Sequence, residues 1–282
     1  MKAVVQLVLA LLLLAGCTSS PGPAAEPTPS TDVGKAPAQP GYGELVTAAG
    51  PLAYWSFDET TGDLAEDSGP DGFDGTYTGG VSLGEESAVA GGGSSVRVDG
   101  ESGHVFVAGA GAPAATALAP ADGVSVELWF RPARLPGATD VDQLARWRWY
   151  GWSIRVSGGR ISADVWADAA PGRTKVDPRQ VIVTGPRLGA GRWHHVVLTQ
   201  DAAEVRLYLD GVQVAGEASV GTLFAPVVDP KLDDAGTGGG VAFGRDADTD
   251  GQYFDGWLDE VAVYPIALPA EVIASHAALA AG

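Results

Sequence analysis

Short runs in which hydrophobic and polar positions alternate, separated by turn residues, fill the chain from residue 52 onward. Alternation with a period of two is typical of β-strands that bury one face. Residues 124–130 show it most clearly, and the run stops at Pro132. Residues 271–279, a short alanine-rich stretch after Pro269, predict the one helix. The other expected strands are residues 52–57, 96–98, 104–107, 152–156, 160–166, 194–200, 204–209, 212–215 and 257–264.

Turn residues between these runs indicate how the strands connect. Gly158-Gly159 and Asp210-Gly211 each separate two alternating runs, and both dipeptides favour the tight turn of a two-residue hairpin. Many short antiparallel strands without intervening helices predict an all-β sandwich or jelly roll. No internal repeat of about 20–50 residues is evident, which excludes propellers and solenoids.

The N-terminal segment has a different pattern. Lys2 precedes an apolar run over residues 3–14, which has the length of a signal peptide and is too short to span a bilayer. The only cysteine follows in the string Leu14-Ala15-Gly16-Cys17, which resembles the lipobox of bacterial lipoproteins. The resemblance implies that residues 1–16 are a lipoprotein signal peptide and that Cys17 is lipidated. The alternative is an ordinary secretory signal with an incidental cysteine.

Residues 17–51 contain many prolines among Ser, Thr, Ala and Gly and show no hydrophobic periodicity. This composition predicts a disordered linker, or tether, with polyproline character. A single folded domain over residues 52–282 follows. No other apolar run approaches membrane-spanning length, so we expect a lipid anchor alone to hold the domain at the extracytoplasmic face of the cell membrane.

Composition supports turn-rich β structure and narrows the partners. The chain has 40 glycines and 19 prolines, with 45% hydrophobic and 18% charged residues, which is ample for one sizeable core. Its formal net charge of -18 disfavours binding to nucleic acid and to anionic lipid headgroups. The same charge could attract calcium, or it could serve solubility alone. One cysteine excludes an intrachain disulfide.

Four segments carry a resemblance to a known family by their order along the chain. They are residues 54–59 with 67–69 and 74–75, residues 124–130, residues 191–197 with 207–211, and residues 254–261 with Tyr264. In this order they resemble the laminin G-like, concanavalin A-like jelly-roll family. The resemblance implies two packed antiparallel sheets. Members of the family are mostly adhesion and sugar-recognition modules, often with a bound calcium.

One candidate calcium site lies in the string 246–251. Asp246, Asp248 and Asp250 alternate along it and are followed by Gly251, as in the first half of an EF-hand loop. The second half does not match, because Trp257 stands where a bidentate Glu belongs. The alternative is a solvated acidic loop.

The family resemblance implies a second candidate calcium site, where the first and last strands meet. The matching carboxylates are those of Asp58 and Asp259, with Asp67 as a further candidate. Carboxylates from distant segments would staple the two ends of the domain together through the cation. The alternative is that Asp58 and Asp259 only accept hydrogen bonds from turn backbone.

An aromatic cluster at residues 146–152 is the candidate ligand contact. Trp152 shares a strand face with Ile154 and is expected in the core. We expect Trp147, Arg148, Trp149 and Tyr150 near a hairpin tip, where rings and guanidinium groups could bind a glycan or a protein carboxylate. The alternative is packing beneath a neighbouring loop.

The sequence disfavours enzyme functions. Neighbours on a strand point to opposite faces, so His194 and His195 cannot converge on one ion and are expected to be structural. No Glu-x-Asp-x-x-Glu, Gly-x-Ser-x-Gly or His-Glu-x-x-His string occurs. The expected function is therefore that of a membrane-anchored recognition module that binds glycans or surface proteins through sandwich loops, assisted by calcium. The alternative is a non-catalytic structural envelope or adhesion protein, and a glycoside hydrolase is the least favoured function.

Overall fold

The structure is a computed structural model, and it describes residues 40–108, 123–147, 151–168, 179–219, 221–223 and 240–281. Contacts along the chain divide it into residues 1–39 and residues 40–282, and every described element belongs to the second unit. The predicted signal peptide, Cys17 and most of the predicted tether lie outside the described residues. None of the described helices is long and apolar enough to cross a membrane.

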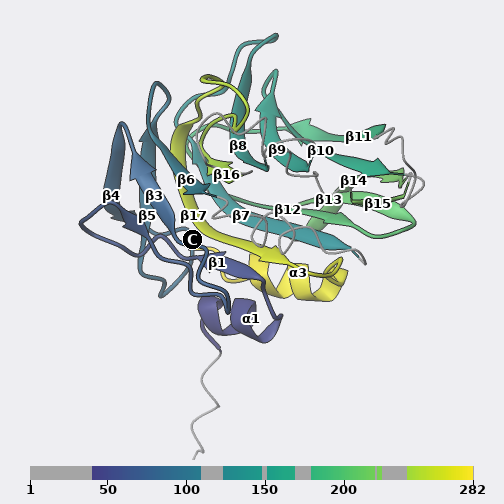
Figure 1. The fold of residues 1–282 in the computed structure, drawn as a ribbon, viewed down its shortest axis with the longest axis horizontal. Helices are drawn as coiled ribbons and strands as arrows, with labels where there is room; N and C mark the ends of the chain where they lie inside the picture. The colour runs from purple at the N-terminus through teal and green to yellow at the C-terminus, as the bar shows by residue number, and fades with distance from the viewer. Residues whose placement is uncertain are drawn as a thin grey trace, which may run out of the picture. The chain divides into compact units, whose positions relative to one another are not determined.

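One of the two antiparallel sheets, the first sheet, contains the N-terminal and C-terminal strands of the domain side by side (Figure 1). Its strand order is β14-β13-β12-β7-β17-β5-β4, and β1 pairs with β17 beyond this path. The strands are β1 (Ala53–Trp55), β4 (Val81–Glu86), β5 (Ser94–Asp99), β7 (Val124–Pro132), β12 (His194–Gln200), β13 (Glu204–Leu209), β14 (Val212–Ala218) and β17 (Asp255–Tyr264).

The second sheet has the order β11-β10-β9-β8-β16-β6-β3-β2, and β15 pairs with β10. Its strands are β2 (Leu64–Ala65), β3 (Gly75–Thr78), β6 (His104–Ala108), β8 (Val141–Trp147), β9 (Trp152–Ser157), β10 (Arg160–Asp168), β11 (Arg179–Arg187), β15 (Thr222–Leu223) and β16 (Gly240–Phe243). All pairings are antiparallel between these strands, so the expected jelly-roll sandwich of two antiparallel sheets is confirmed.

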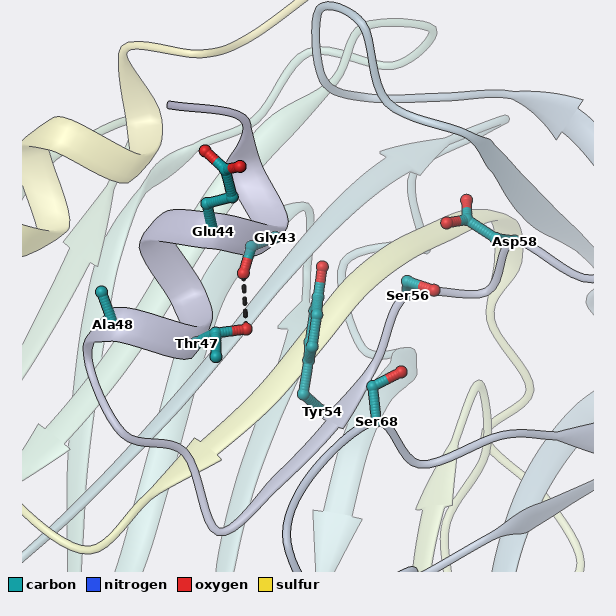
Figure 2. Close-up of a pocket in the computed structure, with 8 residues that line it drawn as sticks. All are labelled: Gly43, Glu44, Thr47, Ala48, Tyr54, Ser56, Asp58 and Ser68. Atoms are coloured by element: carbon teal, nitrogen blue, oxygen red, sulfur yellow. Dashed lines mark hydrogen bonds between the residues drawn. The ribbon is translucent and has the colours of Figure 1, made fainter. Parts of the chain in front are cut away.

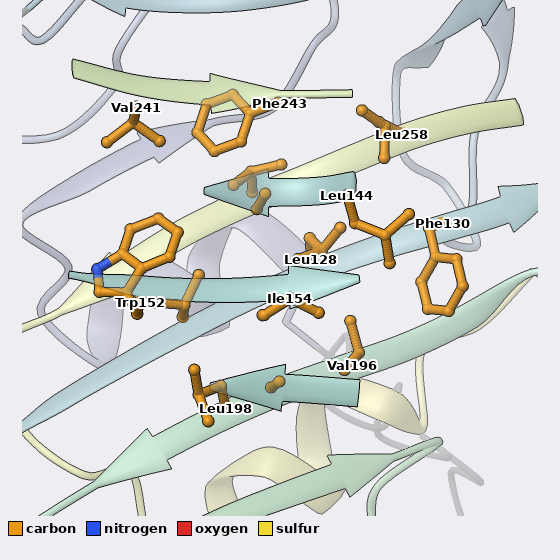
Figure 3. Close-up of a cluster of buried hydrophobic side chains, with 14 of the residues drawn as sticks. Leu128, Phe130, Leu144, Trp152, Ile154, Val196, Leu198, Val241, Phe243 and Leu258 are labelled. Carbon is orange, nitrogen blue, oxygen red and sulfur yellow. The ribbon is translucent and has the colours of Figure 1, made fainter. Parts of the chain in front are cut away.

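The core fills the space between the two sheets (Figure 3). Leu128 and Val196 enter it from the first sheet, and Ile154 and Phe243 enter it from the second. Trp152 is fully buried among them, as the sequence predicts. Each large side chain buried in this way stabilises the fold by about 1.5–3 kcal/mol, so the alternating pattern itself drives the two sheets together.

Both predicted hairpins form with the expected turn chemistry. Gly158 and Gly159 have φ angles of 55° and 75°, and they join β9 to β10 with Ser157 paired to Arg160. Asp210 and Gly211 have φ angles of 51° and 80° and join β13 to β14. Positive φ at both turn positions matches the right-handed twist of the strands, which is why glycine is favoured there.

Two helices, α1 (Tyr42–Ala48) and α3 (Ala270–Ala277), cover the outward face of the first sheet (Figure 1). Helix α3 confirms the predicted C-terminal helix, but α1 corrects the predicted tether, which extended to residue 51. Tyr42 and Val46 lie one helical turn apart and are both buried in a second apolar cluster with Trp129 and Tyr264. The folded domain therefore begins by residue 40. The sequence did not indicate this helix, because glycines surround it and its stability comes from burial of Tyr42 and Val46 against the sandwich.

Candidate functional site

Of the four residues in the predicted aromatic ligand contact, the structure describes Trp147. Trp147 ends β8 with 1% of its surface exposed, and its ring centroid lies 6.5 Å from that of Trp152 inside the core. The expectation of an exposed ring at this position is therefore corrected, because the inward-facing alternation of β8 continues to its last residue. Arg148, Trp149 and Tyr150 lie outside the described residues, so ligand contact there stays a prediction.

A charged network occupies the outward face of the second sheet. Because Trp152 and Ile154 face the core, Ser153 and Arg155 on the same strand face outward. Asp164 on β10 is fully buried on this outward side. Its carboxylate accepts hydrogen bonds from Ser153 Oγ at 2.6 Å and Gln180 Nε2 at 3.1 Å and pairs with the Arg155 guanidinium. A buried carboxylate without a partner would be strongly destabilising, so Arg155 is what allows Asp164 to stay there.

The pKa of Arg155 reflects its burial and the charges around it. Burial lowers the pKa of its guanidinium, and the nearby positive charge of Arg146 lowers it further. Both arginines therefore stand close together on this face, and each is held by carboxylates. Such side chains are fixed in place before any ligand arrives.

Trp166 lies two residues after Asp164 on β10 and therefore on the same outward face. Its side chain is partly exposed, and Gln180 of β11 stands directly opposite it in the register. An indole ring thus lies beside a carboxylate, a guanidinium and an amide. The sequence contained a signal for this residue, because Trp166 falls on the polar side of the alternation in residues 160–166.

The predicted acidic loop folds around an arginine. Asp246 Oδ1 lies 3.2 Å from Nε of Arg146, and Asp248 Oδ2 lies 2.7 Å from Nη2 of the same residue. Asp250 points elsewhere and accepts a hydrogen bond from the Tyr253 hydroxyl. The first two carboxylates do converge on a cation, as the spacing predicts, but that cation is a guanidinium from β8. Calcium binding by this loop stays a prediction.

The second calcium candidate contains an unusual carboxylate. Asp259 is fully buried, and its Oδ2 accepts hydrogen bonds from Ser87 Oγ at 2.9 Å and Ala88 N at 2.8 Å. Its Oδ1 has no hydrogen-bond partner among the described residues. Burial raises the pKa of Asp259 to about 8, and the nearby negative charge of Asp58 also raises it.

Asp58 and Asp67 have different surroundings. Asp58 is exposed, and its Oδ1 accepts a hydrogen bond from Ser94 N at 2.7 Å. Asp67 accepts three backbone hydrogen bonds, from Tyr54, Gly69 and Phe73, each 2.7 Å long. Asp67 therefore holds a turn together. Asp58 and Asp259 also accept backbone hydrogen bonds, from Ser94 and Ala88, as the alternative interpretation of these two residues proposed.

These observations test whether the second site fits calcium. Calcium binds several oxygen ligands at once and favours carboxylates. A cation would supply the missing partner of the buried Asp259 oxygen and would neutralise the negative charges of Asp259 and Asp58. Two residues with left-handed backbone, Phe57 at φ 58° and Glu260 at φ 52°, directly adjoin the two carboxylates. Such strain persists only where the surrounding structure holds it, and it concentrates at binding sites. The residues fit, although the described residues contain no group of three or more His, Cys, Asp or Glu side chains gathered around one point.

A shallow pocket of about 630 Å³ opens beside Asp58, between α1 and the segment that follows β1 (Figure 2). Figure 2 shows Tyr54 between the helix and Asp58. The Tyr54 hydroxyl donates a hydrogen bond to Glu260, the neighbour of Asp259. The lining residues are Gly43, Glu44, Thr47, Ala48, Tyr54, Ser56, Asp58 and Ser68. None of them is basic, so the pocket favours cations over anions.

The two adjacent histidines are structural, as expected. His194 Nδ1 lies 3.1 Å from Asp210 Oδ2, whereas His195 Nε2 lies 2.7 Å from Glu127 Oε1, and both rings are fully buried. Burial acts to raise the pKa of Glu127, but hydrogen bonds from His195 and His276 hold it well below its ordinary value. His276, for which the sequence suggests no partner, thus completes a buried network that no substrate can reach.

Comparison with protein-family models shows which family this chain resembles. The family model Laminin_G_3, described as the concanavalin A-like lectin/glucanases superfamily, matches residues 99–274, which is more than half of the chain. No curated protein matches the sequence.

Solved structures share the fold at low sequence identity. Domain 4 of AbnA, a GH43 extracellular arabinanase from Geobacillus stearothermophilus, solved in complex with arabinotriose, is 21% identical with a TM-score of 0.50, covering 80% of this chain and 98% of that domain. The botulinum neurotoxin serotype C1 binding domain is 10% identical with a TM-score of 0.56, covering 81% and 52%. A structure of botulinum neurotoxin type C, whose cell entry depends on interaction with two ganglioside molecules, is 10% identical with a TM-score of 0.56, covering 83% and 52%.

The chain spans about half the length of these neurotoxin structures. At such identities the likeness concerns the fold, and it agrees with the two-sheet sandwich described above. The family model, which matches residues 99–274, shows in addition which family the chain belongs to. The chain belongs to the Laminin_G_3 family of the concanavalin A-like lectin/glucanase superfamily.

Proposed function

We propose that this protein is a non-catalytic glycan-binding module and that the outward face of the second sheet holds the ligand. The observation that carries the proposal is the partly exposed ring of Trp166 beside the network of Arg155, Asp164 and Gln180. A sugar ring presents C–H bonds on its faces and hydroxyl groups at its edges. The indole of Trp166 can contact the first, and the Arg155 guanidinium and the Gln180 amide can hydrogen-bond the second.

The structural neighbours support glycan binding in general, without indicating a particular sugar. Domain 4 of AbnA was solved with arabinotriose, and neurotoxin type C interacts with gangliosides. Both of these are glycan-containing ligands, and they differ in composition. The neighbours therefore support glycans as the ligand class for this chain, and they leave the sugar to experiment.

A binding role also suits the carboxylates of this face better than hydrolysis does. Glycosidases need a carboxylic acid that can transfer a proton and a second carboxylate that acts as base or nucleophile. Asp164, Asp246 and Asp248 are each held in an ion pair with an arginine. These carboxylates therefore serve to fix the two arginines in place, and they are not suited to exchanging protons with a substrate.

Calorimetric titration of the full chain with arabinotriose and with a ganglioside oligosaccharide tests the proposal. We expect Trp166→Ala to weaken binding about tenfold, because a lost ring contact of about 1.4 kcal/mol is a factor of ten in affinity. Trp193→Ala is the matched control, since Trp193 is also partly exposed but precedes β12 of the first sheet. Absence of binding to both glycans and to a glycan array would favour the structural envelope role instead.

We also propose that calcium assists the domain through Asp58 and Asp259. Calcium would satisfy the Asp259 oxygen that has no partner and offset the repulsion between the two carboxylates. Because Asp58 follows β1 and Asp259 lies in β17, the ion would tie the ends of the domain together. The cation would thus act on stability, since the proposed glycan face belongs to the other sheet.

We further propose that Cys17 carries the lipid anchor and that the domain stands at the extracytoplasmic face of the cell membrane. The lipobox-like string before Cys17 supports this proposal. Mass spectrometry of the membrane fraction is expected to show acyl chains on Cys17. Cys17→Ala is expected to release the protein from membranes, and retention of this variant would contradict the proposal.

A further inference from the structure

The second sheet ends in two strands that each have one neighbour among the described strands. Strand β11 pairs only with β10, and β2 pairs only with β3. They are the opposite edges of the sheet, and Figure 1 shows β11 on the right and β3 on the left. An unpaired strand edge presents backbone donors and acceptors, so each edge is a place where another chain can add to the sheet.

Each of these edges carries an exposed apolar side chain on the same face. Four large hydrophobic side chains are exposed in the described part of the chain, and two of them are Ile182 of β11, at 48%, and Leu64 of β2, at 51%. Val181, Val183 and Ala65, their neighbours along the strands, are buried, so both side chains point outward. The register also places the two in line, through opposite pairs that run from Ile182 to Asp164, Ser153, Arg146, Ala242, Phe106, Thr76 and Leu64. Contact between the two edges would bury both side chains, which is favourable.

The β11 edge is positively charged. Arg179 and Arg187 stand at its two ends, and both are exposed and have no ion pair with a described residue. By contrast, Arg155 and Arg206 are each paired with a carboxylate. Arg187 also stands opposite Arg160 on β10, and like charges directly opposite each other destabilise a sheet. The β11 edge therefore favours a partner that brings carboxylates.

The β2 edge has the opposite charge. Residues 58–74 contain seven Asp and Glu residues and no Lys or Arg. Asp63 and Glu66 lie directly before and after the two residues of β2, and both are exposed and have no ion pair with a described residue. The two edges are therefore complementary in charge, and each has an apolar side chain between its charged groups.

Strand direction allows these two edges to pair across copies of the chain. The path from β11 to β2 contains eight strands, and every step along it is antiparallel. Because the number of steps is odd, β2 of a second copy laid beside β11 continues the antiparallel alternation. Pairing of β11 with β11 of a second copy is disfavoured, because a register centred on Val183 sets Arg179 opposite Arg187.

We infer that the β11 edge of one copy binds the β2 edge of a second copy, so that copies of this chain associate head to tail. Ile182 packs against Leu64 of the next copy, and Arg179 and Arg187 pair with the carboxylates beside β2. The net charge of -18 opposes association at long range, but at physiological ionic strength charges are screened beyond about 8 Å, so contacts at the edges decide. Each added copy leaves one β11 edge and one β2 edge free, so the contact builds open chains rather than closed dimers. It uses none of the residues proposed to bind glycan or calcium.

Sedimentation equilibrium of the full-length protein tests the inference, under reducing conditions that prevent a disulfide between copies through Cys17. At about 0.15 M salt, the average mass is expected to rise with protein concentration past that of a dimer. At about 1 M salt, where the screening length is about 3 Å, the mass is expected to fall toward that of the monomer. Ile182→Ser and Leu64→Ser are each expected to weaken association about tenfold, through loss of one buried apolar contact.

Reversal of charge tests which edges meet. The double variant Arg179→Glu with Arg187→Glu makes the β11 edge acidic, and the double variant Asp63→Arg with Glu66→Arg makes the β2 edge basic. Each double variant alone is expected to stay monomeric. A one-to-one mixture of the two is expected to associate again, because the acidic β11 edge of the first then meets the basic β2 edge of the second.

Val212→Ser is the matched control for Ile182→Ser, because Val212 is 65% exposed and lies in β14 of the first sheet. This variant is expected to associate as the wild type does, and thermal melts show that each variant is folded. A monomer at every concentration, growth that stops at a dimer, or association unchanged in either double variant would overturn the head-to-tail contact. Failure of the mixture of folded double variants to associate would also overturn it.

Discussion

Asp142 is a buried carboxylate whose charge the fold compensates poorly. It is 5% exposed, its Oδ2 has no hydrogen-bond partner among the described residues, and Arg134 Nη1 lies 3.9 Å away. Burial raises the pKa of Asp142 to about 6; Arg134 opposes this shift, whereas Asp255 and Asp140 add to it. The folded protein therefore holds this proton to a higher pH than the unfolded chain does, and the ionised form is the one that the fold disfavours.

Replacing this carboxyl group is expected to change how stability depends on pH. With a folded pKa above the unfolded value, the stability contributed by the protonated group is complete below about pH 4 and is lost as pH rises through about 6. Asp142→Asn removes this loss, so its stability relative to wild type should rise by about 2 kcal/mol between pH 4 and pH 7. Urea unfolding at several pH values measures the difference, and parallel curves for the two proteins would contradict the prediction.

At the scale of elements, helix α1 is attached to the sandwich through one buried carboxylate. Tyr42 Oη donates a hydrogen bond of 2.8 Å to Glu127, which also accepts hydrogen bonds from Tyr264, His195 and His276. Strands β7, β12 and β17 and both helices therefore meet at a single group. A helix of this length is unstable alone, so its position depends on this contact and on the burial of Val46.

Removing the Tyr42 hydroxyl is expected to loosen α1. Tyr42→Phe keeps the ring but takes one donor from a buried carboxylate, which should lower the free energy of unfolding by about 2 kcal/mol. Tyr253→Phe is the matched control, because the Tyr253 hydroxyl bonds to the exposed Asp250 and its loss should leave stability unchanged. Hydrogen exchange of residues 42–48 locates the effect, and equal protection in Tyr42→Phe and wild type would contradict it.

At the scale of the whole molecule, the proposed calcium ion would bridge the first and last strands of the domain by binding Asp58 and Asp259. A ligand that binds only the folded state stabilises it by mass action. At calcium concentrations about a hundred times the dissociation constant, we expect a gain of about 2.7 kcal/mol and a higher melting temperature than in EDTA. Asp259→Asn and Asp58→Asn should abolish this shift.

Asp248→Asn separates this site from the acidic loop, where Arg146 already stands between the carboxylates. The variant is expected to keep the full calcium-dependent shift of the melting temperature. A shift lost in Asp248→Asn and kept in Asp259→Asn would assign calcium to the loop. Equal melting temperatures in calcium and EDTA would remove calcium from both sites.

Most of the strand pattern could be predicted because it depends on residues close together in the sequence. The alternation in residues 124–130 and the turns at Gly158-Gly159 and Asp210-Gly211 each act over a few positions, and all three form as expected. Seven strands were not predicted, namely β2, β3, β4, β8, β11, β15 and β16. In β4 only one face is partly covered, so its hydrophobic contrast is weak. Helix α1 was missed because its burial comes from a distant strand, through Glu127.

The site was less predictable, because charge pairing acts between residues far apart in the chain. The acidic spacing in residues 246–251 indicated convergence on a cation, yet Arg146, 102 positions before Asp248, fills that role. His276 meets Glu127 across 149 positions. The inward direction of Trp147 depends on how far β8 extends, which its pairing with β9 and β16 decides.

The sequence alone determined the class of fold, the hairpins and the family, because hydrophobic alternation and turn formation depend on residues that are adjacent along the chain. Only the tertiary structure decided which carboxylates are paired with arginines and which, such as Asp142 and Asp259, keep a buried oxygen without a hydrogen-bond partner among the described residues, since these outcomes depend on burial and on partners from other strands. It also placed Trp166 beside Gln180, and Ser153 beside Asp164, on one outward face, because strand order and register, rather than spacing along the chain, bring those residues together.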